Sequence, residues 1–322
     1  MLFNYSCYHF TKWVQEGQIT RTEFTIVAVL NGITILPATI LNVLILVSIW
    51  RTPALHRPSI ILMSNLALAD IGVGAVAQPL MLIWAALELN VENWPMSTYC
   101  YVAAFFGNSG SVFGAVSLLS VTAIAFDRFL ALHYHLRYTA IVTVKRVSFL
   151  CFIFWFISLL CVVVWFVLGN SIYSYMAGAV MVMCFGVVLL SYYNVYKVIK
   201  RHQKQINTAQ SSFSEEASSA GENANNMKKY KKSVLNSLLI YFVFIACSTP
   251  FVCAITYFEI TQDNSLSPTL FRLSTSLLFA NSAINPIIYC CKMKELREAV
   301  YQSVTSLNNH LGIAKIEEKE RH

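Results

Sequence analysis

The chain has 322 residues, of which 57% are hydrophobic and 12% are charged, with a formal net charge of +7 at pH 7. Soluble domains average about 25% charged residues, so this composition excludes an ordinary soluble domain and predicts a membrane protein. The positive charge does not indicate a nucleic-acid partner, because every Lys and Arg except Lys12, Arg21 and Arg272 falls on one side of the predicted spans.

Residues 1–23 are the expected extracellular N-terminus. They contain no apolar stretch of the kind that a cleaved signal peptide needs. Asn4 begins the sequon Asn4-Tyr5-Ser6, which makes it a candidate glycosylation site on the outer side. Such triplets also occur by chance.

Seven long apolar runs follow, each long enough to cross a bilayer core, which takes roughly 20 residues. They are Phe24–Trp50, Ser59–Leu87, Tyr99–His133, Val147–Leu168, Tyr173–Lys200, Ser233–Phe258 and Ser267–Cys291. Continuous runs indicate helices, since a barrel would need short alternating strands. The sequence therefore predicts an all-α, seven-transmembrane helix bundle over residues 24–291. The basic loops place the C-terminus in the cytoplasm and the N-terminus outside.

The cytoplasmic segments differ from one another in composition. Residues 205–226 are rich in Ser, Asn, Ala and Glu and predict a disordered loop. Residues 292–304 place Met293, Leu296, Val300 and Val304 on one face, which predicts an amphipathic helix on the inner membrane surface. Residues 305–322 form the expected cytoplasmic tail.

Most of the nine cysteines lie inside apolar runs, so the chain is not a disulfide scaffold. Cys290 and Cys291 adjoin the predicted surface helix and are candidates for palmitoylation. The alternative is that both are small apolar core residues.

The third run ends at Asp127-Arg128. A charge in mid-membrane costs about 2.5–3.5 kcal/mol on insertion scales, so the pair could simply mark the end of a helix at the lipid–water boundary. The alternative is a switch, in which Asp127 holds Arg128 until the helices rearrange. These two residues alone leave both interpretations open.

Polar residues inside the spans are few. Asp70 lies in the second run, and Ser117 lies eleven residues before Arg128, about 16 Å along a helix. Asn281, Ser282 and Asn285 are three or four residues apart and share one helical face. They could be polar contacts that hold helices together. Oxygen-bearing side chains around a carboxylate could equally bind a hard cation.

These residues, in this order, resemble a class A (rhodopsin-like) G-protein-coupled receptor over nearly the whole chain. The resemblance is carried by Asn42 in LNVLILV, Asp70 in NLALAD, Arg128 in DRF, Trp155, Pro250, and Asn285-Pro286 in NPIIY. HYHLRYTAIVTVKRV after DRF, the very short second outer loop and the absence of proline from the fifth run resemble the melanocortin/adenosine/cannabinoid-like branch.

The resemblance implies a plasma-membrane receptor that binds an extracellular ligand and activates a heterotrimeric G protein. Arrestin, a receptor kinase and membrane lipids are the further partners that it implies, without nucleic acid. The implied activation switch consists of Asp127, Arg128, Tyr193, Tyr289, Asn285, Pro286, Phe244 and Pro250. The implied allosteric ligand is a sodium ion held by Asp70, Ser117, Asn281, Ser282 and Asn285, and no other cofactor is expected.

The chain departs from the family at several positions. Ser248 stands where the family usually has tryptophan, so coupling to the sixth helix must use another residue, such as Phe244 or Phe251. Tyr230 stands where some relatives have an acid, which argues against a second lock on Arg128. The loop at residues 169–175 contains no cysteine, so we expect no bridge from Cys100 to it and regard Cys7 as its only plausible partner.

The ligand is specified less well. The outer half of the third run has no aspartate to anchor a biogenic amine, and Phe279 stands where opsins carry the retinal lysine. The candidate pocket residues are Gln78, Asn108, Ser111, Ser248, Phe251 and Glu259. Acids at the outer rim, among them Glu88 and Glu259, suit a cationic or amphipathic ligand. Alternatively the rim is merely solvated, with Glu259 paired to Arg272.

Two alternatives to a signalling receptor are a transporter and a silent partner receptor. A seven-helix transporter would be expected to show repeats or broken helices, which the sequence does not show. A silent partner receptor would tend to lose DRF or NPxxY, and both are present. The chain has no HExxH, GxSxG or His/Cys metal cluster, so it is not predicted to be an enzyme.

Overall fold

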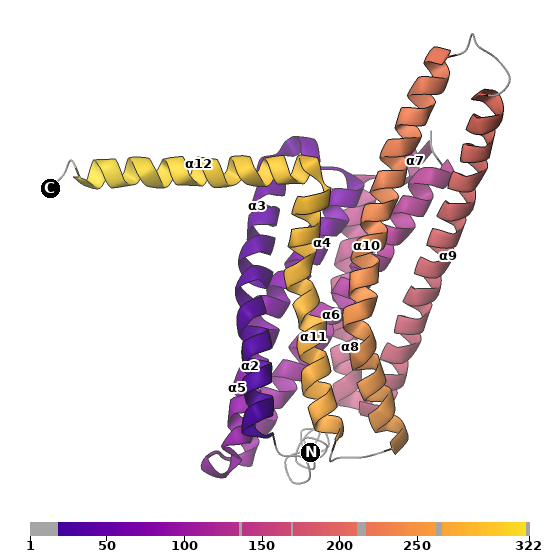
Figure 1. The fold of residues 1–322 in the computed structure, drawn as a ribbon. Helices are drawn as coiled ribbons and strands as arrows, with labels where there is room; N and C mark the ends of the chain where they lie inside the picture. Colours follow the sequence, from indigo (N-terminus) through magenta and orange to yellow (C-terminus); the bar gives the residue numbers. More distant parts are fainter. Residues whose placement is uncertain (1–18, 135–136, 169, 211–216, 262–265, 320–322) are drawn as a thin grey trace.

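The computed structural model describes residues 19–134, 137–168, 170–210, 217–261 and 266–319. Within these ranges the chain is helical and contains no strand. The long helices run side by side as a bundle, and the last helix lies across one end of it (Figure 1). We call the end where α2 begins the outer end and the end near α12 the inner end.

Seven helical stretches build the bundle, and two of them contain short π-helical segments. They are α2 Arg21–Leu36 with η1 Pro37–Leu41 and α3 Asn42–Arg51; α4 Pro58–Gly72 with η3 Val73–Ala77 and α5 Gln78–Leu89; α6 Met96–Tyr134; α8 Val144–Leu168; α9 Asn170–Gln210; α10 Ala217–Thr261; and α11 Ser267–Lys292. The connections include η2 Pro53–Leu55, η4 Val91–Asn93 and α7 Tyr138–Ile141. Each predicted span falls within one stretch, which confirms the predicted helix bundle.

Six of the described stretches are long and apolar enough to cross a membrane. The exception is α11, whose sequence contains Arg272, Ser274, Thr275, Ser276, Asn281, Ser282 and Asn285. All seven side chains are buried, so the polar face of α11 meets the rest of the bundle. The polarity of α11 therefore reflects the neighbouring helices of the bundle against which it packs.

Helix α6 contacts α4, α5, α8 and α9 and lies at the centre of the bundle. Its Phe113 ring presses onto Gly72 of α4, where an added Cβ would lie 2.3 Å from ring atom Cε1, so this contact requires glycine. On α8, the Trp155 indole donates to Asn65 Oδ1 (2.9 Å), and Asn65 Nδ2 donates to Ser120 Oγ (2.8 Å). Trp155 thus joins α8 to α4 and α6.

The two π-helical segments face each other. An added Cβ at Gly74 in η3 would lie 2.6 Å from Thr39 Oγ1 in η1, so glycine permits this close approach. Pro37 opens η1 and has no backbone N–H to place in a helical hydrogen bond. Single π-helical turns often occur at functional sites, and η3 begins three residues after Asp70.

Most of the segment predicted as a disordered loop, residues 205–226, is helical in the structure. Helix α9 continues to Gln210 and α10 begins at Ala217, while residues 211–216 lie outside the described part. Both helices project beyond the bundle at its inner end (Figure 1). Extending an existing helix avoids the cost of nucleation, and the Ala, Glu and Gln of this segment are good helix formers.

Helix α12 spans Lys294–Lys319 and runs nearly perpendicular to the bundle (Figure 1). It is longer than the predicted 292–304 and takes in much of the expected tail. Leu296 and Ala299 are buried against the bundle, and Val304 is exposed. Its contact with a membrane surface stays a prediction. Cys291 is exposed at the end of α11, and Cys290 is half-buried; both are free thiols, and their palmitoylation also stays a prediction.

Cys100 forms a disulfide. The seven other cysteines in the described residues are free thiols, so none of them is its partner. A bridge from α6 to the following outer loop is therefore absent from the described structure, as expected from the composition of that loop. Cys7 and the Asn4 sequon lie outside the described residues.

We expect peptide mapping by mass spectrometry without reduction to recover Cys100 linked to Cys7. The free thiols, including the exposed Cys253, should alkylate under the same non-reducing denaturing conditions. Cys7→Ser should leave Cys100 alkylated without reduction, whereas Cys253→Ser should not change its state. A linkage from Cys100 to any other cysteine would contradict the prediction.

Candidate functional site

The polar residues predicted around Asp70 meet in the middle of the bundle. Asp70 on α4 is fully buried, and its Oδ2 accepts a hydrogen bond from Asn285 Nδ2 on α11 (2.8 Å). The Ser282 hydroxyl lies within hydrogen-bonding reach of the same carboxylate. Ser117 on α6 and Asn281 on α11 are also buried. The direct contacts to Asp70 thus come from Asn285 and Ser282.

Several oxygen atoms of this set have no hydrogen-bond partner among the described residues. They are Asp70 Oδ1, Ser117 Oγ, Asn281 Oδ1 and Asn285 Oδ1. A buried carbonyl or carboxylate oxygen without a donor costs about 1–3 kcal/mol, so these atoms call for water or a cation. The donor set is all oxygen, as a hard cation requires.

The site contains a single carboxylate, which limits the kind of metal that it could hold. Among the described residues, no group of three or more His, Cys, Asp or Glu side chains is placed to bind a metal. A transition metal would need nitrogen or sulfur ligands. One carboxylate with hydroxyl and amide oxygens fits a monovalent ion such as sodium.

Asn42 compensates for the proline in α11. Pro286 has no backbone N–H, so the carbonyl four residues earlier, that of Ser282, lacks its helical donor. Asn42 Nδ2 donates to this Ser282 carbonyl (3.0 Å) and to the carbonyl of Ala38 (2.8 Å). The first stretch of the bundle is thereby joined to the proline bend beside Asp70.

Asp127 and Arg128 form an ion pair near the inner end of α6. Arg128 Nη2 lies 3.0 Å from Asp127 Oδ2, and the two side chains are 16% and 4% exposed. The Tyr138 hydroxyl on α7 donates to Asp127 Oδ1 (2.6 Å), so the aspartate is held from two sides. Sequence reasoning found the ion pair but missed Tyr138.

Two adjacent tyrosines of α9, Tyr192 and Tyr193, have different surroundings, and the switch role of Tyr193 stays a prediction. The Tyr193 side chain is 61% exposed on the outside of the bundle. Tyr192 lies within electrostatic reach of Arg128, and its ring centroid is 6.1 Å from that of Tyr241 on α10. Tyr192 lies beside the buried face formed by Cys184, Val188, Ser191 and Val195, and Tyr193 lies outside it.

Tyr289 is fully buried on α11, as an inward-facing member of the switch should be. The hydroxyls of Tyr192, Tyr241 and Tyr289 have no hydrogen-bond partner within the described chain. On α10, Phe244 belongs to the core around α6, and the Ser248 hydroxyl donates to the Phe244 carbonyl. Ser248 is therefore engaged with its own helix, two residues before the half-buried Pro250.

The predicted ligand-pocket residues are not gathered in one place. Gln78 Nε2 donates to Thr34 Oγ1 (2.7 Å) and Asn31 Oδ1 (3.2 Å), so its amide joins α5 to α2. Asn108 donates to a carbonyl of its own helix, and Ser111 contacts Tyr173 on α9. The Phe251 ring packs on Phe271. The side chain of Glu259 is not described.

Aromatic rings fill the space between α5, α6 and α11 in the outer half. The Trp84 ring stacks on that of Phe106 (centroids 5.3 Å apart), and Phe271 meets both rings edge-on. Phe279 meets Phe106 edge-on and would lie 3.2 Å from a Cβ added at Gly110. A ligand site on this side would have to displace these rings.

Comparison with known proteins agrees with this architecture. A family model described as "7 transmembrane receptor (rhodopsin family)" matches residues 41–174 and 169–289. Melanopsin of Branchiostoma belcheri is 22% identical over 301 residues, 86% of this chain but only 42% of that protein. Adenosine receptor A3 of Ovis aries and histamine H2 receptor of Homo sapiens are each 24% identical over 310 residues, covering 87% and 88% of this chain and 88% and 80% of those receptors.

These similarities do not resolve a branch. Adenosine receptor A3 and melanocortin receptor 5 of Mus musculus (24% identical over 276 residues, 82% of this chain and 79% of that receptor) carry names from the branch that the sequence resembles, but melanopsin and histamine H2 receptor match about equally well. The narrower assignment stays a prediction.

Proposed function

The chain belongs to the rhodopsin-like family of seven-transmembrane receptors, and on this premise we propose that it binds an extracellular ligand and activates a heterotrimeric G protein at its inner end. The family comprises receptors and not enzymes. The observation that carries the proposal is the Asp127–Arg128 ion pair, which lies at the inner end of the central helix with a partly exposed guanidinium. Arginine forms strong hydrogen bonds to carbonyl and carboxylate groups of a partner.

The proposed mechanism is a rearrangement of the inner helix ends. Release of Arg128 from Asp127 would let the arginine reach the G protein, while Tyr193 and Tyr289 turn toward it. Three buried tyrosine hydroxyls without partners suit such a change, because new hydrogen bonds would satisfy them. Helices α9 and α10 project on this side and would border the G protein (Figure 1).

The Asp70 set would hold a sodium ion in the resting receptor. Asp70, Ser117, Asn281, Ser282 and Asn285 supply oxygen atoms, four of which lack donors in the described structure. The ion would neutralise the buried carboxylate, which has Asn285 and Ser282 as its direct contacts.

The ligand would bind in the outer half on the side of α6, α9 and α10. The opposite side is filled by the rings around Trp84, and the Gln78 amide is hydrogen-bonded to α2. The candidate contacts that remain are Asn108, Ser111 and Phe251. The outer half of α6 carries no charge, which favours an uncharged or amphipathic ligand over a biogenic amine. Arrestin, a receptor kinase and lipids of the plasma membrane are the further partners.

A nucleotide-exchange screen tests the proposal. We expect purified receptor in lipid nanodiscs to accelerate nucleotide exchange on at least one of the heterotrimeric G-protein classes when peptide, lipid, nucleoside and amine libraries are added. Nanodiscs containing a receptor with the Asp127-Arg128 pair replaced by alanines are the control. Ligand binding or ligand transport without exchange on any G protein would contradict the proposal and favour a transporter or a silent receptor.

A further inference from the structure

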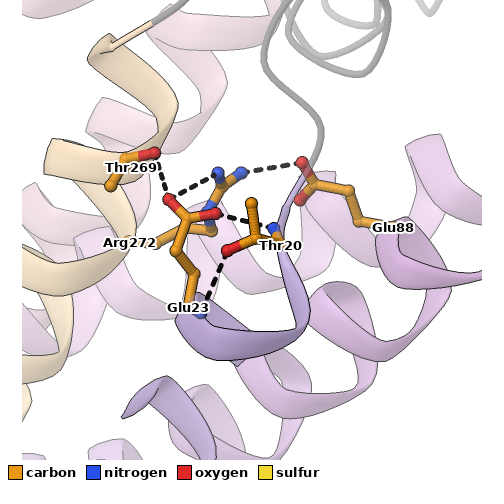
Figure 2. Close-up of polar contacts among 5 residues, drawn as sticks. All are labelled: Thr20, Glu23, Glu88, Thr269 and Arg272. Carbon is orange, nitrogen blue, oxygen red and sulfur yellow. Dashed lines mark hydrogen bonds and ion pairs between the residues drawn. The ribbon is translucent and has the colours of Figure 1, made fainter. Parts of the chain in front are cut away.

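A buried ionic cluster joins three helices at the outer end of the bundle (Figure 2). Arg272 on α11 lies between Glu88 on α5 and Glu23 on α2, with Nη1 2.7 Å from Glu88 Oε1 and Nη2 3.9 Å from Glu23 Oε1. The side chains of Arg272 and Glu88 are 1% and 0% exposed. We call Glu23, Glu88 and Arg272 the outer cluster.

Glu23 is fixed by local structure before it meets the arginine. It is the third residue of α2, and Thr20 caps that helix: Thr20 N donates to Glu23 Oε2 (2.7 Å), and Glu23 N donates to Thr20 Oγ1 (3.2 Å). The Thr269 hydroxyl of α11 donates to the other oxygen, Oε1. This capping box holds the carboxylate at the start of α2, facing α11 (Figure 2).

A buried arrangement of this kind is weak evidence for stability but can fix one geometry. Removing water from a carboxylate and a guanidinium costs several kcal/mol per ion, which their attraction repays only when the geometry is good. A planar guanidinium can serve two carboxylates from two helices at once, and a lysine ammonium cannot reproduce that fork. The outer cluster therefore specifies where α11 lies relative to α2 and α5.

Hydrogen bonds continue from this cluster toward the centre of the bundle along the same helices. Ser276 Oγ donates to the Arg272 carbonyl (2.9 Å) and accepts from Asn31 Nδ2 (2.9 Å), and Asn31 accepts from Gln78. One to two turns further inward, Asn42 binds the Ser282 carbonyl beside the Asp70–Asn285 contact. Arg272 and Asn285 are thirteen residues apart, about 20 Å along α11.

We propose that Arg272 is a positioning residue: held by Glu88 and Glu23, it fixes α11 at the register in which Asn285 meets Asp70, and so stabilises the resting receptor. The structure has the Asp127–Arg128 pair formed, which by resemblance is the resting arrangement, so the outer cluster is a contact of that arrangement. Weakening a contact that the resting state makes and the active state does not shifts the population toward the active state. This second step rests on the proposed function, whereas the effect on α11 does not.

Three variants test the proposal, each in full-length receptor in nanodiscs. Glu88→Gln removes one charge with little change in shape. Arg272→Lys keeps the charge but cannot span both carboxylates. The double variant Glu88→Gln/Arg272→Met leaves neither a carboxylate nor a guanidinium unpaired at this pair. The matched controls are Glu92→Gln and Arg21→Lys, which make the same changes at exposed outer positions.

Hydrogen exchange of α11, followed by mass spectrometry, is the readout that does not depend on a G protein. In the variants, we expect hydrogen exchange to accelerate several-fold in the outer peptide 268–276 and also in the inner peptide 277–289, which contains Asn285. A local structural role would affect the outer peptide only. The controls should match the unmutated receptor in both peptides.

The second readout is ligand-free nucleotide exchange, normalised to the amount of folded receptor in the nanodiscs. Couplings between sites are typically 5–150-fold, and we expect about a tenfold rise for Glu88→Gln and Arg272→Lys. Faster hydrogen exchange confined to peptide 268–276, or equal changes in the controls, would overturn the proposal. If the inner peptide responds but no variant and no unmutated receptor activates a G protein, the proposed function fails and the positioning role stands.

Discussion

Replacing Arg128 by alanine is expected to abolish signalling while leaving the receptor folded and able to bind ligand. The guanidinium is the only group in the described ion pair that could leave Asp127 and contact the G protein. Asp127 would retain the hydrogen bond from Tyr138, so its carboxylate keeps a donor when the Arg128 guanidinium is removed. Nucleotide exchange should fall by at least about tenfold, as couplings of 1–3 kcal/mol imply.

The measurement compares exchange, ligand affinity and surface expression for Arg128→Ala with those for Arg51→Ala. Arg51 is an exposed arginine at the inner end of α3 and is the matched control. The control should signal normally. Full signalling by Arg128→Ala would return Asp127-Arg128 to the role of a simple helix-end pair at the membrane boundary.

Replacing Asp70 by asparagine is expected to remove the effect of sodium on agonist affinity. Asp70 is fully buried, and the groups that contact it directly are an amide and a hydroxyl. Either the carboxyl is neutral, or a cation accompanies it. If sodium binds the resting state and activation expels it, sodium and agonist must each lower the affinity of the other by the same factor.

The measurement is agonist binding in sodium chloride and in choline chloride at equal ionic strength. The unmutated receptor should bind agonist more weakly in sodium, on the order of tenfold for a coupling of about 1.4 kcal/mol. Asp70→Asn should show no difference between the salts, and Ser117→Ala should show a smaller difference than the unmutated receptor. Glu92→Gln, an exposed acid-to-amide change, is the control. Equal affinity of the unmutated receptor in both salts would leave Asp70 as a neutral hydrogen-bonding residue.

The sequence predicted the spans well, because the length of an apolar run is a local property. The contact between Asp70 and Asn285 was also anticipated, since few polar residues lie at that depth and each buried one needs a partner. The role of polar neighbours at the Pro286 bend followed from the missing N–H of proline. In each case the constraint is strong and the candidates are few.

The outer cluster could not be found in this way. Glu23, Glu88 and Arg272 are distant in the sequence, and each lies near the end of a span, where a charged side chain ordinarily remains solvated. Their burial depends on how three helices pack, and no local pattern encodes that. The position of Tyr192 within electrostatic reach of Arg128 could not be predicted for a similar reason, because without a proline the rotation of the fifth helix can be read only from its faintly amphipathic face.

The polarity of α11 has a consequence for how the protein is made. Membrane insertion proceeds by partitioning each segment into lipid, and an arginine within a segment opposes this by about 2.5–3.5 kcal/mol near its centre and less near its ends. The partners of Arg272, Ser276 and Asn285 lie on helices near the start of the chain. Helix α11 is synthesised after those helices, and Arg272 and Asn285 meet these partners only once it docks against them. Biogenesis of this receptor thus depends on α2, α4 and α5 staying close enough together for α11 to dock against them.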